Sequence, residues 1–217
     1  MIHSKHMLIY IVEKQYDNTT LVLNGKFPSS GMIIEKIKSS NFIIAVDGAA
    51  NELKKFSIQP NVIIGDFDSI NELNDSSIRY INTPDQSKTD FKKSLEWIIE
   101  QKFSQVSIFG LSGKSDDHFL GNIYTFNEFS HLINLQAFTD TSIITPCIGK
   151  NDFESFKNQK VSLFSLENPS FITSKNLEYE LDRFELYPSD NAIRNISKGN
   201  TFTIESSSKV LVFQIIN

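Results

Sequence analysis

Residues 61 to 69 read Asn-Val-Ile-Ile-Gly-Asp-Phe-Asp-Ser, a short apolar run that ends in a glycine and two carboxylates one residue apart. The apolar run predicts a buried strand, and residues 65 to 69 predict the loop at its carboxyl end. In a doubly wound parallel sheet, that end faces the crevice in which ligands bind. Two neighbouring carboxylates favour a bound cation, and their hard oxygen atoms suit Mg²⁺ carried by phosphates. A solvated, Asp-rich surface turn is the alternative interpretation.

The composition narrows the class of protein. The chain has 217 residues, 40% of them hydrophobic, which is enough for one large domain or two small ones with an ordinary core. The net charge of -5 and the lack of a basic run argue against a nucleic-acid partner. The single cysteine, Cys147, excludes an internal disulfide and fits a reducing compartment. The apolar run at residues 8 to 12 is too short to span a membrane, so we expect a cytoplasmic protein with no membrane partner.

The first two thirds of the chain alternate predicted strands with predicted helices. Strands are predicted at residues 8–12, 21–23, 42–46, 62–64, 78–81 and 106–109. Helices are predicted at residues 32–39 with Met32, Ile33 and Ile37 inward, from Asp47 toward Phe56, from Thr89 or Asp90 with Phe91, Leu95, Ile98 and Ile99 on one face, and after His118. This alternation predicts an α/β domain, residues 1–145, with a mainly parallel sheet and helices on both faces.

The pattern changes near Pro146. A polar stretch at residues 149–156 is followed by short alternating apolar runs, which predict strands at residues 161–166, 171–173, 177–181, 192–196, 201–204 and 210–215. Ser206-Ser207-Ser208 is interpreted as a hairpin turn. We therefore expect a smaller all-β sandwich or roll at residues 158–217, with the domain boundary between residues 145 and 158.

Five acids gather at one predicted edge of the sheet. Asp47 follows one strand, Asp66 and Asp68 follow another, Asp90 starts a helix, and Asp117 lies where a strand gives way to a helix. Each acid alone is well explained as a cap or turn residue. Together they predict a metal and phosphate site, since helix N-termini and glycine turns at that edge offer N–H groups to phosphate oxygens.

Four motifs in this order resemble the thiamine pyrophosphokinase (thiamine diphosphokinase) family. They are Asp47-Gly48-Ala49-Ala50-Asn51, Gly65-Asp66-Phe67-Asp68-Ser69, Asp85-Gln86-Ser87-Lys88-Thr89-Asp90-Phe91, and residues 110–122 with Asp117-His118. The resemblance implies a homodimer, in which the α/β domain binds ATP and the β domain helps to build the thiamine site across the interface. It also implies transfer of the pyrophosphoryl group of ATP to the hydroxyl of thiamine, with Mg²⁺, giving thiamine diphosphate and AMP.

The resemblance also implies roles for individual residues. Asp66, Asp68 and Asp90 match the catalytic acids that handle Mg²⁺ and the phosphates, and the matches to substrate-binding residues are Asp47, Asn51, Gln86, Asp117, His118 and Asn195. Which acid, if any, deprotonates the hydroxyl stays open. The chain departs from the family at Gly113-Lys114-Ser115, where Gly-Gly-Arg is usual, and near Asn195, the only residue left of a Ser-Asn-Glu motif. Lys114 is a point charge and does not reproduce a bidentate arginine contact.

Two other functions compete with this reading. A nucleotide-sugar glycosyltransferase also uses an Asp-x-Asp for metal, but it leaves residues 86–90 unexplained. A non-enzymatic nucleotide-binding or thiamine-binding module would account for the missing arginine. Such a module, however, has less need of a full cluster of acids.

Among the other side chains, we interpret Trp97 as a packing residue and Lys88, Lys92 and Lys93 as a solvated helix face. The C-terminal phenylalanines Phe153, Phe156, Phe164, Phe171 and Phe184 are expected to include a dimer surface.

Overall fold

A computed structural model describes residues 18–70, 75–190 and 192–216, and it divides the chain into two compact units, Met1–Thr139 and Asp140–Asn217. The first unit alternates helices and strands, and the described residues of the second form strands and no helix. The coarse prediction of an α/β region followed by a strand-rich region is therefore confirmed. The strand predicted at residues 8–12 lies outside the described residues.

The sheet of the first unit has the order β6-β5-β1-β2-β3-β4, and all of its described strand pairs are parallel. Its strands are β1 (Thr19–Val22), β2 (Phe42–Val46), β3 (Val62–Gly65), β4 (Arg79–Asn82), β5 (Gln105–Phe109) and β6 (Asn134–Phe138). The chain first builds outward from β1 to β4 and then returns to the other side of β1 with β5. This reversal is a topological switch point, and the carboxyl ends of the strands next to it are where ligands bind in such folds.

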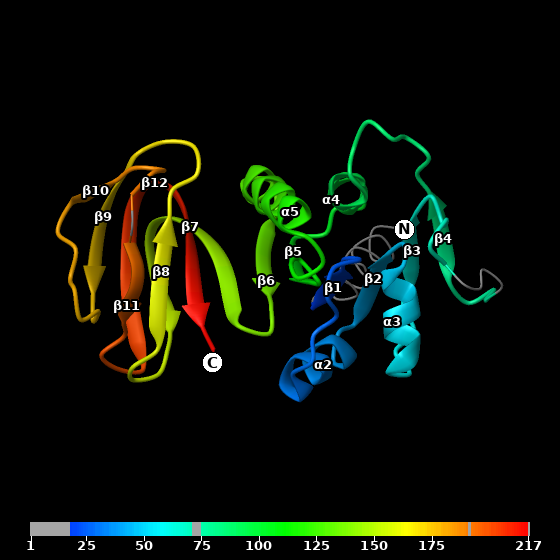
Figure 1. Ribbon diagram of the computed structural model, residues 1–217, viewed down its shortest axis with the longest axis horizontal. Coiled ribbons are helices and arrows are strands. Elements are labelled where there is room, and N and C mark those ends of the chain that lie inside the picture. The colour runs from blue at the N-terminus through cyan, green and yellow to red at the C-terminus, as the bar shows by residue number, and fades with distance from the viewer. Residues whose placement is uncertain (1–17, 71–74, 191, 217) are drawn as a thin grey trace, which may run out of the picture. The chain divides into compact units, whose positions relative to one another are not determined.

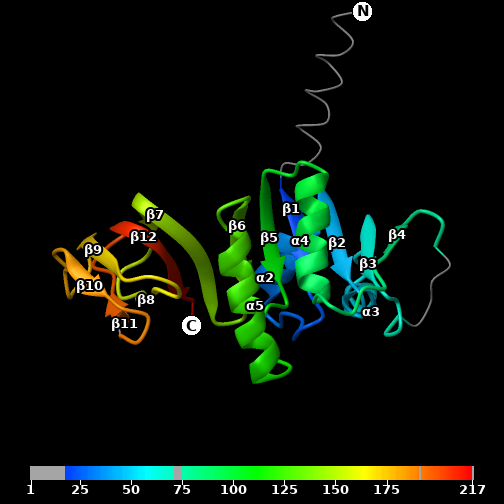
Figure 2. The same ribbon diagram turned by 90° about the horizontal axis from the view of Figure 1, so that it is seen from above.

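Helices cover both sides of this sheet. They are α2 (Gly31–Lys38), α3 (Ala49–Lys55), α4 (Asp90–Glu100) and α5 (Asp116–Phe129). Figures 1 and 2 show α4 and α5 on one side of the strands and α2 and α3 on the other. Among the described helices, none is long and apolar enough to cross a membrane.

Helices α2 and α4 bury apolar stripes, with two departures from the prediction. Ile33 and Ile37 are 4% and 0% exposed, and their spacing of four residues defines the buried face of α2. Met32 was expected beside them but is 83% exposed, because consecutive residues of a helix point in different directions and Met32 faces solvent where Ile33 faces the core. In α4, Phe91, Leu95 and Ile98 are buried as predicted, and Ile99 is only half-buried.

Two long strands organise the second unit. β7 (Ser142–Glu154) and β12 (Thr201–Ile215) pair along most of their lengths, with a shift of register between Ser206 and Val210. One half of β12 pairs with β9 (Ser170–Lys175), which pairs with β10 (Phe184–Leu186). The other half pairs with β8 (Lys160–Phe164), which pairs with β11 (Ala192–Ile196). All these pairs are antiparallel, and their inner faces meet in a core that includes Val161, Phe202, Ile204 and Val212.

Several predictions for this unit were wrong. Residues 201–204 and 210–215 belong to the single strand β12, and Ser206-Ser207-Ser208 lies at its bulge and not in a hairpin turn. Residues 177–181 form no strand, since Leu177 makes only an isolated bridge to Ser197. The polar stretch at residues 149–156 lies largely within β7, because Phe153 supplies a buried position that its polar neighbours hide in the sequence. The strand β6 was not predicted at all.

Candidate active site

Three acids converge at the carboxyl ends of β2 and β3. Asp47 directly follows β2, and Asp66 and Asp68 follow β3. One carboxylate oxygen from each lies within 4.8 Å of the others. Asp47 is only 5% exposed, and its buried Oδ1 has no hydrogen-bond partner among the described residues. A buried, unpaired carboxylate oxygen beside two further acids is costly unless a cation binds there.

The backbone at this edge is shaped to bring the acids together. Asp47 and Phe67 both adopt left-handed backbone conformations, with φ of 44° and 68°. The N–H of Asp47 donates to the carbonyl of Ile64 at 2.9 Å, which holds the turn after β2 against β3. A Cβ on Gly65 would lie 3.0 Å from the Cβ of Asp47, so glycine at this position permits the close approach.

Asp66 is held as an ionised acceptor. Its Oδ2 accepts from Nε2 of Gln86 at 3.0 Å, and its Oδ1 accepts a longer hydrogen bond of 3.4 Å from the N–H of Asp68. These two hydrogen bonds, with a smaller contribution from the charge of Lys93, hold the pKa of Asp66 below its ordinary value. Nearby, Nδ2 of Asn51 donates to the carbonyl of Ser69 at 2.7 Å and so ties the acidic loop to α3.

A buried lysine organises the loop between β4 and α4. Lys93 is 8% exposed, and its Nζ donates to the carbonyls of Thr83 at 2.7 Å and Asp85 at 3.0 Å. The same ammonium forms an ion pair with Oδ1 of Asp90 at 2.6 Å. Asp90 is therefore paired with Lys93 at the start of α4 and is not a member of the three-acid cluster. The interpretation of Lys93 as a solvated residue was wrong, because the loop before α4 folds over it and supplies two carbonyl acceptors beside the carboxylate of Asp90.

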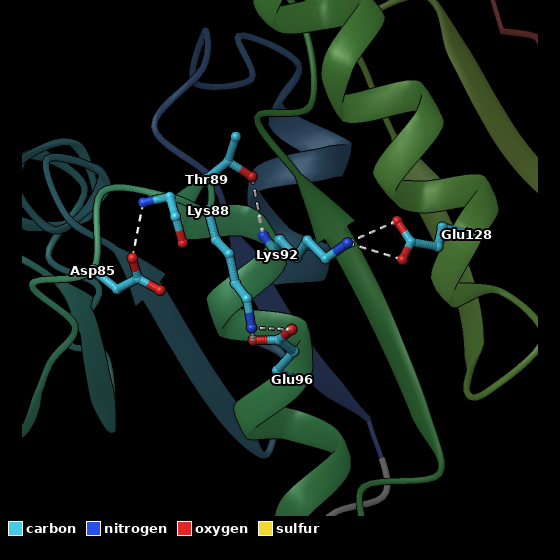
Figure 3. A network of polar contacts seen from close by, with 7 residues as sticks. Asp85, Lys88, Thr89, Lys92, Glu96 and Glu128 are labelled. Carbon is cyan, nitrogen blue, oxygen red and sulfur yellow. Dashed lines mark hydrogen bonds and ion pairs between the residues drawn. The ribbon is translucent and has the colours of Figure 1, made fainter.

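The neighbouring lysines are more exposed than Lys93, and Figure 3 shows them paired with glutamates. Lys88 Nζ bonds Glu96 at 2.8 Å along α4, and Lys92 Nζ bonds Glu128 of α5 at 2.9 Å. The N-cap of α4 is Thr89, whose Oγ1 accepts from the N–H of Lys92 at 3.3 Å. These contacts fix the first turn of α4, on which Asp90 lies.

A cavity of about 610 Å³ lies beside these loops in the first unit. Its walls come from the segment after β1, the loop before α4 and the loop between β5 and α5, and they include Gln86, Asp90, Lys114, His118 and Asn122. The volume falls in the range of about 300 to 1,000 Å³ typical of small-molecule sites. Lys114 Nζ donates to Oδ1 of Asn24 at 2.6 Å, which fixes its positive charge at the cavity wall.

The start of α5 forms another part of this wall. His118 Nδ1 is 2.9 Å from Oγ of Ser115, and the pKa of Asp117 lies below its ordinary value because Ser115 and the backbone of His118 hydrogen-bond its carboxylate. His118 lines the cavity, whereas Asp117 does not. The side chain of Ser115, the N-cap of α5, caps none of the first N–H groups of this helix.

Asn195 lies in the second unit, on β11. Its Oδ1 accepts from the N–H groups of Tyr179 at 3.0 Å and Ile196 at 2.9 Å, and its Nδ2 donates to the carbonyl of Tyr179 at 2.7 Å. The amide is thus bonded to backbone on both of its polar atoms. In this arrangement Asn195 fixes the shape of the segment around Tyr179.

The structure thus brings together some of the predicted site residues and separates others. Asp47, Asp66 and Asp68 form one cluster, with Gln86 and Asn51 holding its loops. Gln86, Asp90 and His118 line the cavity of the first unit.

The sequence did not predict two residues that hold the site, Lys93 and Asn24, because their contacts come from segments distant in sequence. A signal for Lys93 was available in its spacing of three residues from Asp90, which places the two charges on one helix face.

The chain matches two family models in succession. Residues 34–138 match the thiamin pyrophosphokinase catalytic domain, and residues 142–213 match the thiamin pyrophosphokinase substrate-binding domain. Similar proteins include thiamin pyrophosphokinase 1 of Caenorhabditis elegans, 25% identical over 94% of this chain and 91% of the relative. Thiamine pyrophosphokinase of Bacillus subtilis is 28% identical over 75% of this chain and 76% of the relative.

Solved structures agree with this match at the level of the fold. The thiamin pyrophosphokinase of Candida albicans superimposes with a TM-score of 0.82 at 18% identity, covering 94% of this chain and 91% of the other. The Bacillus subtilis enzyme gives a TM-score of 0.80 at 20% identity, covering 91% and 98%. Neither family model belongs to a glycosyltransferase, so that alternative is set aside. Since the two matched domains together span most of residues 34–213, the chain belongs to the thiamin pyrophosphokinase family and is a thiamine diphosphokinase.

Proposed function

We propose that the chain carries out Mg²⁺-dependent transfer of the pyrophosphoryl group of ATP to thiamine, with the metal held by Asp47, Asp66 and Asp68. The observation that supports this assignment is the buried Oδ1 of Asp47, which lacks a partner among the described residues and lies beside two further carboxylates. This set differs from the one expected from the family motifs, in which Asp90 took the place of Asp47.

The donor chemistry fits Mg²⁺. All three residues offer hard oxygen atoms, and Mg²⁺ in phosphate-transfer sites is commonly held by one or two carboxylates together with substrate phosphates. When bound, Mg²⁺ would neutralise charge on the phosphate oxygens of ATP. Asp66 is suited to this role at neutral pH, since the hydrogen bond from Gln86 and the backbone of Asp68 keep its carboxyl ionised.

In the reaction, the hydroxyl oxygen of thiamine forms a bond to the β-phosphorus of ATP. The bond from that phosphorus to the bridging oxygen of AMP breaks, AMP leaves with the electron pair, and the hydroxyl proton is released. Phosphoryl transfer of this kind depends mostly on positioning and on electrostatic stabilisation. The chain supplies positive charge at the cavity wall from Lys114.

The remaining predicted residues act mainly by holding these groups in place. Gln86 orients Asp66, Asn51 anchors the loop that carries Asp68, and the Asp90–Lys93 ion pair fixes the loop before α4. His118 lines the cavity and contacts ATP in this proposal, and Asp117 supports the turn beside it. Asn195 contributes to the thiamine site through the backbone of Tyr179, which its amide holds.

The second unit is the proposed dimer-forming and thiamine-binding part of the chain. Several of its large apolar side chains are exposed, namely Ile148, Phe156, Phe171, Tyr179, Phe184, Tyr187 and Ile193. Of the phenylalanines expected at a dimer surface, Phe153 is instead buried in the core, at 8% exposure. Light scattering coupled to gel filtration tests the proposal: a homodimer has twice the mass of the 24.7 kDa chain, and Phe171→Ser weakens it.

The catalytic proposal is tested with purified protein, ATP and thiamine, by following AMP and thiamine diphosphate together with Mg²⁺ or with EDTA. Equal, Mg²⁺-dependent formation of both products is expected. Asp47→Asn and Asp68→Asn should each remove most of this activity, and Asp182→Asn, at an exposed acid of the second unit, should not. Turnover of Asp68→Asn at the wild-type rate would refute the metal-binding role of Asp68. Formation of ADP and thiamine monophosphate would refute the transfer of a pyrophosphoryl group.

A second readout isolates the metal from the chemistry. Mg²⁺ that binds only the folded protein raises its melting temperature in proportion to the logarithm of its concentration. Wild type and Asp182→Asn should show this rise, and Asp68→Asn should lose it. In the absence of Mg²⁺, Asp68→Asn should melt no lower than wild type, because the substitution removes repulsion among the three acids.

A further inference from the structure

A second cavity, of about 280 Å³, lies at the opposite edge of the first unit's sheet. Phe42 and Arg79 are the first residues of β2 and β4, so this cavity is at the amino ends of parallel strands whose carboxyl ends carry the acids. The last turn of α4 closes it with Trp97 and Gln101. Asp90 starts the same helix, and the seven residues to Trp97 amount to about 10 Å of helical rise. The cavity is therefore distinct from the catalytic site.

Hydrogen-bond donors that bond to no other described residue gather in this cavity. The guanidinium of Arg79 lies 5.7 Å from the centre of the Trp97 ring, and no carboxylate among the described residues pairs with it. The indole N–H of Trp97 and the side-chain amide of Gln101 also bond to no described residue. Asn61 is oriented by its Oδ1, which accepts from the N–H of Ile43 at 2.7 Å, and its Nδ2 bonds to no described residue.

The walls between these donors are aromatic. The Phe103 ring lies 6.0 Å from Trp97 and 5.4 Å from Phe42, measured between ring centres. Ser77 lines the cavity too, while its hydroxyl donates to the carboxylate of Asp75. Asp75 is itself outside the lining, and Gln59 and Ser77 occupy its oxygens. The positive charge of Arg79 thus faces a cavity whose described lining residues include no acid.

We propose that this cavity is a binding site for a small aromatic carboxylate with a single ring. A guanidinium matches the planar geometry of a carboxylate and can bond both of its oxygens. The rings of Phe42, Trp97 and Phe103 suit a flat apolar body. The volume is just below the usual range of about 300 to 1,000 Å³, which limits the ligand to one ring.

Trp97 makes the test direct, because it is the only tryptophan of the chain and lies in the cavity wall. Benzoate is titrated into the full-length protein and Trp97 fluorescence is followed, with benzamide as the matched neutral ligand. We expect a saturable change at millimolar benzoate and at least tenfold weaker binding of benzamide. Arg79→Ala should weaken benzoate at least tenfold, and Arg79→Lys, which keeps the charge without the planar fork, should weaken it several-fold.

Arg183→Ala is the matched control, since Arg183 of the second unit also lies over an aromatic ring, 5.8 Å from the centre of Phe171. It should bind benzoate as wild type does. Equal affinity for benzamide and benzoate, no saturable change, or unaltered binding by Arg79→Ala would each overturn the proposal. Because this cavity is separate from the acid cluster, Asp68→Asn should bind benzoate like wild type even where it lacks activity.

Discussion

Replacing Lys93 by methionine tests how the active-site loop is held. Lys93→Met keeps the length of the side chain but removes an ammonium that bonds the carbonyls of Thr83 and Asp85 and pairs with Asp90. Truncating one member of a buried ion pair costs about 3 to 5 kcal/mol, because the other charge is left unpaired. The Asp90 side chain is 34% exposed, so water can resolvate it. We therefore expect a loss near the lower limit, about 3 kcal/mol.

Urea unfolding followed by Trp97 fluorescence measures this loss in the first unit, where the only tryptophan lies. With a slope of about 2 kcal/mol per molar urea, the midpoint should fall by about 1.5 M. The kcat/KM for ATP should fall as well, since the loop carries Gln86, which orients Asp66.

Lys92→Met is the matched control one residue away. Lys92 makes a surface ion pair with Glu128, and such pairs contribute only about 0 to 1 kcal/mol. Its midpoint should shift by less than about 0.5 M on the same slope. The reasoning fails if Lys93→Met unfolds at the same urea concentration as Lys92→Met and retains its kcat/KM.

Three further perturbations probe other parts of the chain. Gly65→Ala should lower activity, because the new Cβ meets the Cβ of Asp47 at 3.0 Å and displaces that acid. Gly121→Ala should leave activity unchanged, because its new Cβ has no atom within 4 Å. Equal activities of the two variants would contradict the packing argument. Gln86→Ala should raise the pKa of Asp66, as followed by carboxyl NMR. Because the pKa of Asp66 is depressed in the folded protein, Gln86→Ala should lower the free energy of unfolding by its full amount only above the ordinary aspartate pKa. The difference from wild type should vanish as the pH falls through the pKa that Asp66 has in the folded protein. A difference that does not change with pH would contradict this role of Gln86. Burial raises the pKa of Cys147 to about 11, so a thiol reagent at pH 8 should react slowly with native protein and rapidly in urea, and fast labelling of native protein would refute its burial.

The sequence predicted the acidic edge because its signals are local. Each apolar run ends directly before its acid, so the strand and the position of Asp47, Asp66 or Asp68 could be predicted from a few consecutive residues. The motif order then indicated the family. Asp90 was expected in the acid cluster, but Asp47 takes that place in the structure. This difference could not be foreseen, since it depends on the ion pair between Lys93 and Asp90.

What failed depends on contacts between distant residues. Lys93 looks solvated on a helical wheel, but the carbonyls of Thr83 and Asp85 accept hydrogen bonds from its buried ammonium. The bulge between Ser206 and Val210 interrupts the alternation of β12, so one strand was divided into two. Met32 was assigned inward on hydrophobicity alone, although the Ile33–Ile37 pair already defined the buried face of α2.

The long strand β12 also determines the order in which the chain can fold. Every strand of the first unit lies before residue 139, so its sheet can form while the rest of the chain is still being synthesised. The second unit has no such freedom, because β7, β8 and β9 all pair with residues 201–215. β8 and β9 can pair earlier with β11 and β10, but each keeps one edge unpaired until this last segment arrives. That interval is when a chaperone would be most useful to the newly made chain.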